Sequence, residues 1–217
     1  MACLEYKFRA PKKQFVKPPP LLLLLHGYGS NENDLFSFAD YLHDDFLVIS
    51  VRAPYALQPV GYAWYAIHFD QDRGKWSDDE QAKESTKIIM QFLKELHNEH
   101  LFDQSQIHLL GFSQGGILSY ALGLSHPNKF TSIAVLSGYL NQNITQLQTE
   151  LEAPSIFVAH GTLDEVVPYA WGVESVKLLI EKGIQPEVSY EAVGHTLGQK
   201  GFQNLLKWHE MLRANQG

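Results

Sequence analysis

One short segment combines a nucleophilic side chain with the small residues that would expose it. The sequence Gly111-Phe112-Ser113-Gln114-Gly115 follows the apolar run Ile107–Leu110 and precedes a segment in which apolar residues recur at helical spacing. A serine on such a sharp strand-to-helix turn forms a nucleophile elbow, in which flanking glycines relieve crowding and the hydroxyl is lifted out of the sheet. The helix that begins near Gln114 would also direct unpaired backbone N–H groups at a developing oxyanion. We therefore expect Ser113 to be a catalytic nucleophile.

A serine hydroxyl needs a general base, and the base needs a carboxylate that holds its orientation. Around an elbow of this kind the chain order is serine, acid, histidine, which excludes most of the ten histidines. His195 lies in a short loop before the last expected helix. His209 lies inside that helix on a face with Leu205, as a packed side chain would. The sequence therefore predicts His195 as the base.

The acid should lie in the loop that follows the apolar run Ile156–Ala159. Asp164 and Glu165 both lie there, and Asp164 is farther from Pro168, which is expected to begin the next helix. We predict Asp164 as the acid and Glu165 as an exposed charge. His160 precedes both in the chain, so a structural hydrogen bond is its expected role.

The second oxyanion donor should come from the loop after the apolar run Leu21–Leu25. That loop reads His26-Gly27-Tyr28-Gly29-Ser30, and its two glycines would let the backbone approach a ligand closely. A dinucleotide-binding loop would need a third glycine where this chain has Glu32, so we reject that reading.

Aromatic residues crowd the segment between the second expected strand and the following helix. They are interleaved with glycine, aspartate and arginine, which is the composition of a loop, although aromatic clusters usually belong to a core. We interpret this segment as a loop that borders an apolar acyl cavity. Its aromatic residues are Tyr62, Trp64, Tyr65, Phe69 and Trp76.

Apolar runs of strand length alternate with segments of helical period, which is typical of an α/β protein. The helix after the aromatic segment has the form of a capping box that starts at Ser77. Near-continuous apolar runs indicate buried parallel strands, and here they are Leu21–Leu25, Phe46–Val51, Ile107–Leu110, Ile133–Leu136 and Ile156–Ala159, with Val188–Val193 as a more polar candidate.

The expected fold is a mostly parallel, doubly wound sheet with helices on both faces. Leu4–Arg9 alternates between apolar and charged residues, as an edge strand does, so residues 1–17 are expected to form an edge strand and its connection. We expect residues 1–217 to form a single domain. Parallel sheets of this kind bind ligands at the carboxyl ends of their strands, where all the candidate residues fall.

Composition excludes several other functions. The 217 residues carry 17 Lys and Arg against 24 Asp and Glu, a formal net charge of −7, which disfavours nucleic acid and anionic membranes. The histidines lack metal-ligand spacing and there is one cysteine, so we expect no metal site and no intrachain disulfide. The run Leu21–Leu25 is the longest apolar run and is too short for stable membrane insertion. An intracellular, soluble protein is expected.

Together, these motifs resemble the phospholipase/carboxylesterase group of α/β-hydrolases, which includes the acyl-protein thioesterases. The resemblance covers about Leu21 to Leu212 and rests on Leu24–Gly29, Gly111–Gly116, His160–Pro168 and Gly194-His195. It implies an α/β-hydrolase fold with the backbone N–H groups of Tyr28 and Gln114 as oxyanion donors. It also implies hydrolysis of short- to medium-chain carboxylic esters without a cofactor, in the cytoplasm, and assembly as a homodimer.

The sequence thus predicts a serine hydrolase that cleaves small-molecule esters through an acyl-enzyme. The residues expected to contact the substrate are Tyr28, Trp64, Tyr65 and Val167. A lysophospholipase and an acyl-protein thioesterase are the nearer alternatives. A binding module that keeps the hydrolase scaffold without its chemistry is the more distant alternative, because a fold does not guarantee a function.

Overall fold

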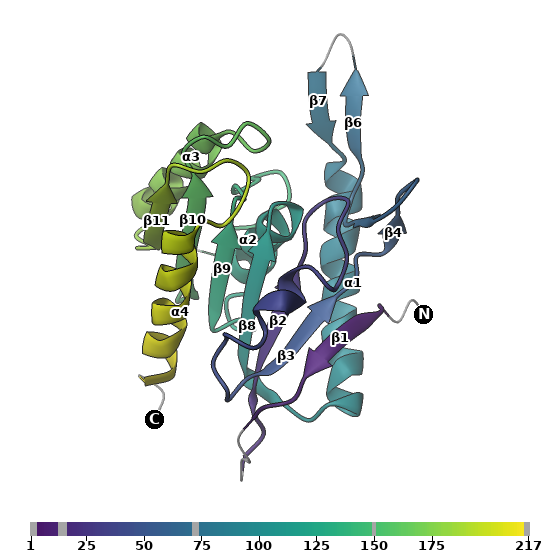
Figure 1. The fold of residues 1–217 in the computed structure, drawn as a ribbon, viewed down its shortest axis with the longest axis vertical. Coiled ribbons are helices and arrows are strands. Elements are labelled where there is room, and N and C mark those ends of the chain that lie inside the picture. Colours follow the sequence, from purple (N-terminus) through teal and green to yellow (C-terminus); the bar gives the residue numbers. More distant parts are fainter. Residues whose placement is uncertain (1–3, 13–16, 71–73, 149–150, 215–217) are drawn as a thin grey trace.

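The computed structural model describes residues 4–12, 17–70, 74–148 and 151–214, and they build a seven-stranded sheet with the order β1-β3-β2-β8-β9-β10-β11 (Figure 1). The strand β1 pairs antiparallel with β3 at one edge, and the other neighbours are parallel. The expected mostly parallel sheet is confirmed. The strands are β1 Tyr6–Arg9, β2 Pro20–Leu25, β3 Leu47–Val51, β8 Asp103–Phe112, β9 Ser132–Leu136, β10 Ser155–Gly161 and β11 Glu187–Glu191.

Helices cover both faces of this sheet, as expected. They are the 3-10 helix η1 Leu35–Phe38, α1 Asp79–Glu99, α2 Gln114–Ser125, α3 Tyr169–Glu181 and α4 Gln199–Ala214. Successive side chains of a strand point to opposite faces, so Leu21 and Leu23 of β2 pack in the cluster that includes α1, α2 and α3, whereas Leu22 and Leu24 pack with η1 and α4. Figure 1 shows α4 crossing the near face while α1 lies behind the sheet. Burial on both faces explains why β2 is apolar throughout.

The segment expected to be a loop is instead two short hairpins. The strands β4 (Tyr55–Ala56) and β5 (Tyr62–Ala63) form the first, and β6 (Ile67–Asp70) and β7 (Gly74–Ser77) form the second, both antiparallel. The β6–β7 hairpin projects away from the sheet at the top of Figure 1. The side chains of two of the predicted aromatic residues, Phe69 and Trp76, lie outside the described part of the structure.

The start of α1 corrects a second expectation. Ser77 pairs with Ile67 at the end of β7, so it is not free to cap the helix. Asp78 is the cap, and its Oδ1 accepts the backbone N–H of Gln81 at 2.9 Å. The predicted helix itself is confirmed.

The order of the strands creates the crevice in which the candidate residues meet. The strand β2 lies between β3 and β8. The chain leaves β2 toward η1 on one face and leaves β8 toward α2 on the other. Connections that diverge in this way open a crevice at the carboxyl ends of the two strands.

Within the described ranges, no helix has the length and apolar character that crossing a membrane requires.

Candidate active site

Ser113 sits on a strained turn between β8 and α2. Its backbone has φ 53° and ψ −115°, a left-handed conformation that is rare for a residue with a side chain and costs about 1–3 kcal/mol. Its N–H donates to the carbonyl of Leu136 at 2.8 Å, which fixes the turn. A Cβ on Gly111 would collide with the carbonyl of Gly115, and one on Gly115 would collide with the carbonyl of Leu25. The glycines at both flanks are therefore required by close backbone packing.

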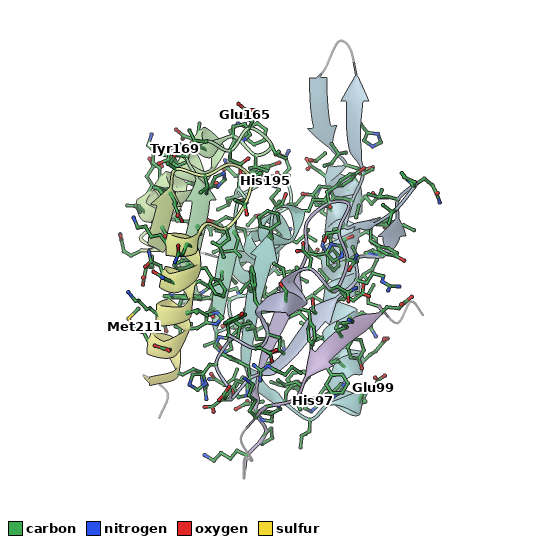
Figure 2. All side chains as sticks on the ribbon, viewed as in Figure 1. His97, Glu99, Glu165, Tyr169, His195 and Met211 are labelled. Carbon is green, nitrogen blue, oxygen red and sulfur yellow. The ribbon has the colours of Figure 1, made fainter. Side chains whose placement is uncertain are left out.

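The structure brings the three predicted catalytic side chains together. His195 Nε2 lies 3.0 Å from Ser113 Oγ, and His195 Nδ1 lies 2.7 Å from Asp164 Oδ2. These are hydrogen-bond distances across 82 and 31 residues of chain, respectively. Figure 2 shows His195 at the same end of the molecule as Glu165, the residue after Asp164, whereas Met211 and Glu99 lie at the opposite end.

The carboxylate of Asp164 is held by the turn that follows it. Its side chain is fully buried, and its Oδ1 accepts the backbone N–H groups of Val166 and Val167, each at 2.9 Å. Its Oδ2 is thereby directed to His195. Glu165 is exposed, as expected. Of the two candidate acids, only Asp164 reaches the imidazole.

The loop after β2 approaches the serine as expected. A Cβ on Gly27 would lie 3.3 Å from the Cβ of Ser113, so the backbone of this loop is in near contact with the elbow. Gln114 is the first residue of α2, and the N–H of a first helical residue has no partner within its own helix. Tyr28 and Gln114 both line the cavity next to Ser113.

His26 fixes the direction of this loop, a role that the sequence did not reveal. It is fully buried, and its Nε2 accepts the N–H of Ala53 at 3.0 Å, so the ring hydrogen is on Nδ1. Nδ1 lies 2.7 Å from the carbonyl oxygen of Gly27. In a trans peptide unit the C=O and the following N–H point in opposite directions. Holding the Gly27 carbonyl therefore also sets the direction of the Tyr28 N–H. Burial lowers the pKa of His26, which favours this neutral form.

The side chain of Gln114 ties the elbow to the hairpin segment. Its Oε1 accepts the N–H of Trp64 at 3.1 Å, and its Nε2 donates to the carbonyl of Tyr65 at 2.8 Å. The indole of Trp64 has no exposed surface and donates to the carbonyl of His26 at 2.9 Å. Trp64 does not line the cavity, so its position does not support the expected substrate contact. Its aromatic ring belongs to the core.

A cavity of about 410 Å³ opens beside Ser113, within the range of small-molecule sites. Three of the predicted contacts, Tyr28, Tyr65 and Val167, line it. The sequence did not single out the other large apolar side chains of the lining, Ile67, Phe112, Ile117, Tyr139, Val166 and Trp171, which come from six separate segments. A neighbouring cavity of about 600 Å³ shares Ser77, Tyr139 and Trp171 with it but contains no triad residue. Ser113 and His195 therefore belong to the smaller cavity.

Among the residues with described side chains, no three His, Cys, Asp or Glu are grouped so that they could hold a metal ion.

Comparison with known proteins places this geometry in a family. The family model described as phospholipase/carboxylesterase matches residues 11–212. The acyl-protein thioesterase 1 of Cryptococcus neoformans var. neoformans serotype D is 28% identical over 214 residues, covering 86% of this chain and 90% of its own. Lysophospholipase-like protein 1 of Mus musculus is 27% identical over 208 residues, covering 86% and 84%.

The solved structures agree. The Bacillus cereus carboxylesterase superposes with a TM-score of 0.82 at 26% identity, over 97% of this chain and 95% of that one. Esterase PE8 has the same TM-score at 24% identity, over 97% and 100%. The chain has the fold of these hydrolases across nearly its whole length, and it belongs to the phospholipase/carboxylesterase family.

Proposed function

We propose that this protein is a serine hydrolase that cleaves short- to medium-chain carboxylic esters through an acyl-enzyme. One observation carries the proposal: an unbroken line of hydrogen bonds from Asp164 Oδ2 through His195 to Ser113 Oγ, ending at an apolar cavity. Nucleophile, base and orienting acid in mutual contact are the geometry that acyl transfer needs.

The reaction follows from the positions of these atoms. As Ser113 Oγ attacks the ester carbonyl, its proton passes to His195 Nε2, 3.0 Å away. Asp164 keeps the other ring nitrogen protonated and stabilises the imidazolium. The carbonyl oxygen becomes an oxyanion that accepts hydrogen bonds from the backbone N–H groups of Tyr28 and Gln114. His195 then protonates the leaving alcohol, and a water that it activates releases the acid and frees Ser113. Every role is filled by a residue of this chain, so the proposed reaction uses no cofactor and no metal.

The cavity supports the proposed length of the acyl group. At about 410 Å³ it lies near the lower end of the usual range for ligand sites. Tyr139 and Trp171, whose ring centroids are 5.0 Å apart, stand between it and the neighbouring cavity. A short or medium acyl chain fits the apolar space on the side of Ser113.

Acyl thioesters are a second candidate substrate class, because the Cryptococcus relative is named an acyl-protein thioesterase. An oxygen ester and a thioester pass through the same acyl-enzyme and differ in the leaving group. The name of the Mus musculus relative, lysophospholipase-like protein 1, adds lysolipids as a third class.

Replacing Ser113 with alanine tests the chemistry. We expect Ser113→Ala to lower kcat for p-nitrophenyl butyrate by about 10⁶-fold, and to abolish labelling by a fluorophosphonate probe. Ser50→Ala is the matched control, because Ser50 is also buried but lies in β3, and its hydroxyl has no hydrogen-bond partner among the described residues. Unchanged hydrolysis by Ser113→Ala would refute the assignment. If the unaltered protein neither hydrolyses esters nor reacts with the probe, it is a binding module on this scaffold.

A substrate panel separates the three classes. We expect kcat/KM to be higher for p-nitrophenyl butyrate and octanoate than for the palmitate ester, for the matching acyl thioesters and for lysophosphatidylcholine. A preference for the thioesters, or for the lysolipid, would replace the ester proposal with that class.

We also propose, from the family resemblance, that the protein acts in the cytoplasm and as a homodimer. Cell fractionation tests the first proposal, and light scattering during size-exclusion chromatography tests the second. Recovery in a membrane fraction, or a monomeric mass at the highest concentration, would contradict the respective proposal.

A further inference from the structure

His160 is a buried histidine beside the triad that the reaction described above does not use. It lies near the end of β10, and its side chain has no exposed surface. Its Nε2 is 2.9 Å from the carbonyl oxygen of Val167 and 3.4 Å from Oδ2 of Asp164. It therefore touches both the acid and the turn that holds the acid.

The contacts of the ring settle where its hydrogen lies. A carbonyl oxygen only accepts, so the Nε2 that faces Val167 carries the hydrogen and donates it. The other nitrogen, Nδ1, has no hydrogen-bond partner in the described structure and faces Gly172 of α3. A Cβ on Gly172 would lie only 2.5 Å from Nδ1. The ring is thus held by a hydrogen bond on one side and by backbone packing on the other.

Val167 is held by hydrogen bonds at both its N–H and its carbonyl. Its N–H donates to Oδ1 of Asp164 at 2.9 Å, and its carbonyl accepts from His160. Val167 is 6% exposed, so without the imidazole its carbonyl would be left in a buried place with no donor. The turn could then shift to expose this carbonyl to water, and the N–H of the same residue, which orients the Asp164 carboxylate, would be displaced with the turn.

We propose that His160 is a positioning residue: by holding the carbonyl of Val167, it keeps the carboxylate of Asp164 directed at His195. This inference rests on the proposed function, because its effect is read from ester hydrolysis. The carboxylate works by orientation, and a displacement of about 1 Å in such a group can lower turnover by about 10²-fold. The effect should fall mainly on kcat, because His160 itself does not line the substrate cavity; Val167 does line it, so a smaller change in KM accompanies the loss of kcat.

Two substitutions separate the hydrogen bond from the volume of the ring. His160→Leu removes the donor and keeps an apolar side chain, whereas His160→Gln places an amide N–H within a similar reach. We expect His160→Leu to lower kcat for p-nitrophenyl butyrate by about 10²-fold and to change KM by less than about 3-fold. Labelling of Ser113 by a fluorophosphonate probe should slow in parallel. His160→Gln should recover most of the lost kcat.

A matched control and an independent variant complete the test. His209→Leu removes another buried imidazole, from α4, and should leave kcat unchanged. Gly172→Ala keeps His160 but pushes its ring through the close contact with Nδ1, so it should lower kcat by less than His160→Leu does. Gly172→Ala decides the question if His160→Leu does not fold.

The proposal is overturned if folded His160→Leu keeps the kcat of the unaltered protein. It is also overturned if His160→Gln loses as much kcat as His160→Leu, since the shape of the ring rather than its hydrogen bond would then matter. If His160→Leu does not fold, full activity of Gly172→Ala overturns the proposal instead. Failure of the proposed function looks different, because the unaltered protein itself would then show neither hydrolysis nor labelling.

Discussion

Two pairs of buried histidines occupy different regions of this molecule. His26 and His160 lie at the carboxyl ends of β2 and β10, beside the proposed catalytic site. Each places a ring nitrogen within hydrogen-bond distance of a backbone carbonyl in a loop that shapes the site, Gly27 for His26 and Val167 for His160. Their contacts determine where backbone groups of the site point.

The other pair lies in the core between the sheet and α4. His108 of β8 and His209 of α4 both contact the ring of Phe46, with ring centroids 5.0 and 5.7 Å apart. His108 Nδ1 meets the hydroxyl of Ser132 at 2.7 Å, but its Nε2 and both nitrogens of His209 have no hydrogen-bond partner in the described structure.

All four side chains are buried, so burial alone does not distinguish them. The difference lies in what their nitrogens contact. A buried imidazole that holds a backbone carbonyl can act on the direction of a loop and hence on a reaction. A buried imidazole whose nitrogens contact no backbone group of the site can act on stability alone. Substitutions of His26 or His160 should therefore lower turnover, whereas substitutions of His108 or His209 should change only the stability of the fold.

Among the substitutions that test this comparison, the largest effect is expected at Asp164, the acid that His160 contacts. Asp164→Asn keeps the size of the side chain but removes the charge that faces both His195 and His160. We expect kcat to fall by about 10⁴-fold, because an amide no longer holds the imidazole in its productive tautomer. Steady-state hydrolysis of p-nitrophenyl butyrate measures this loss.

Glu165→Gln is the control for that substitution, since Glu165 is the next residue and is exposed. It should change kcat by no more than about 2-fold, as surface substitutions away from a site usually do little. If Glu165→Gln were the more damaging of the two, the acid would be misassigned.

His26 gives the next largest effect. In His26→Leu the carbonyl of Gly27 loses its imidazole donor and keeps, within the part of the chain that the structure describes, only the weaker contact from the N–H of Ser30 at 3.3 Å. The Tyr28 N–H is then free to turn away from the oxyanion, and losing one oxyanion donor costs about 10²–10³ in kcat. His209→Leu, in the same assay, should leave kcat unchanged. Equal losses in the two variants would mean that the two pairs do not differ.

The meeting of Ser113, His195 and Asp164 was predictable from sequence because each of the three lies in a recognisable local pattern. A tight turn between a strand and a helix needs the small residues at Gly111 and Gly115, the fixed chain order then selects His195, and distance from Pro168 favours Asp164 over Glu165. The strands were predictable for a similar reason, because a sheet covered on both faces requires apolar runs such as that of β2.

What the sequence did not reveal depends on contacts between distant segments. The residues next to Trp64 in the sequence are typical of a loop. Its N–H nevertheless donates to the side chain of Gln114, 50 residues away, and this hydrogen bond holds its backbone in the core. The role of His26 rests on the N–H of Ala53, which reaches it across 27 residues. Ser77 fits a capping pattern, but pairing with Ile67 moves the cap to Asp78. No periodicity within one segment encodes such pairings.

The smallest effect concerns the core pair and appears as a dependence of stability on pH. Burial lowers the pKa of His108 to about 3 and that of His209 to about 4, whereas an unfolded histidine titrates near ~6.5. As pH falls below about 6.5, the unfolded chain binds protons that the folded chain does not. The free energy of unfolding should therefore decrease by roughly 1 kcal/mol per histidine for each pH unit. The loss should stop at about pH 4 for His209 and about pH 3 for His108.

Urea unfolding measures this effect in the unaltered protein and in His209→Leu. The measurements are made at about pH 7, 6 and 5, which cover the range just above and below the pKa of an unfolded histidine. His209→Leu should show a shallower loss of stability between pH 6 and 5, by about the share of one histidine. His126→Gln, at an exposed histidine, should keep the original dependence. An unchanged slope in His209→Leu would show that this ring does not resist protonation.

Because neither nitrogen of His209 has a partner in the described structure, leucine removes a titrating group without leaving a donor or acceptor unpaired. A shallower slope therefore reports the loss of the His209 proton, together with the smaller effect of relieving His108, whose pKa His209 also lowers.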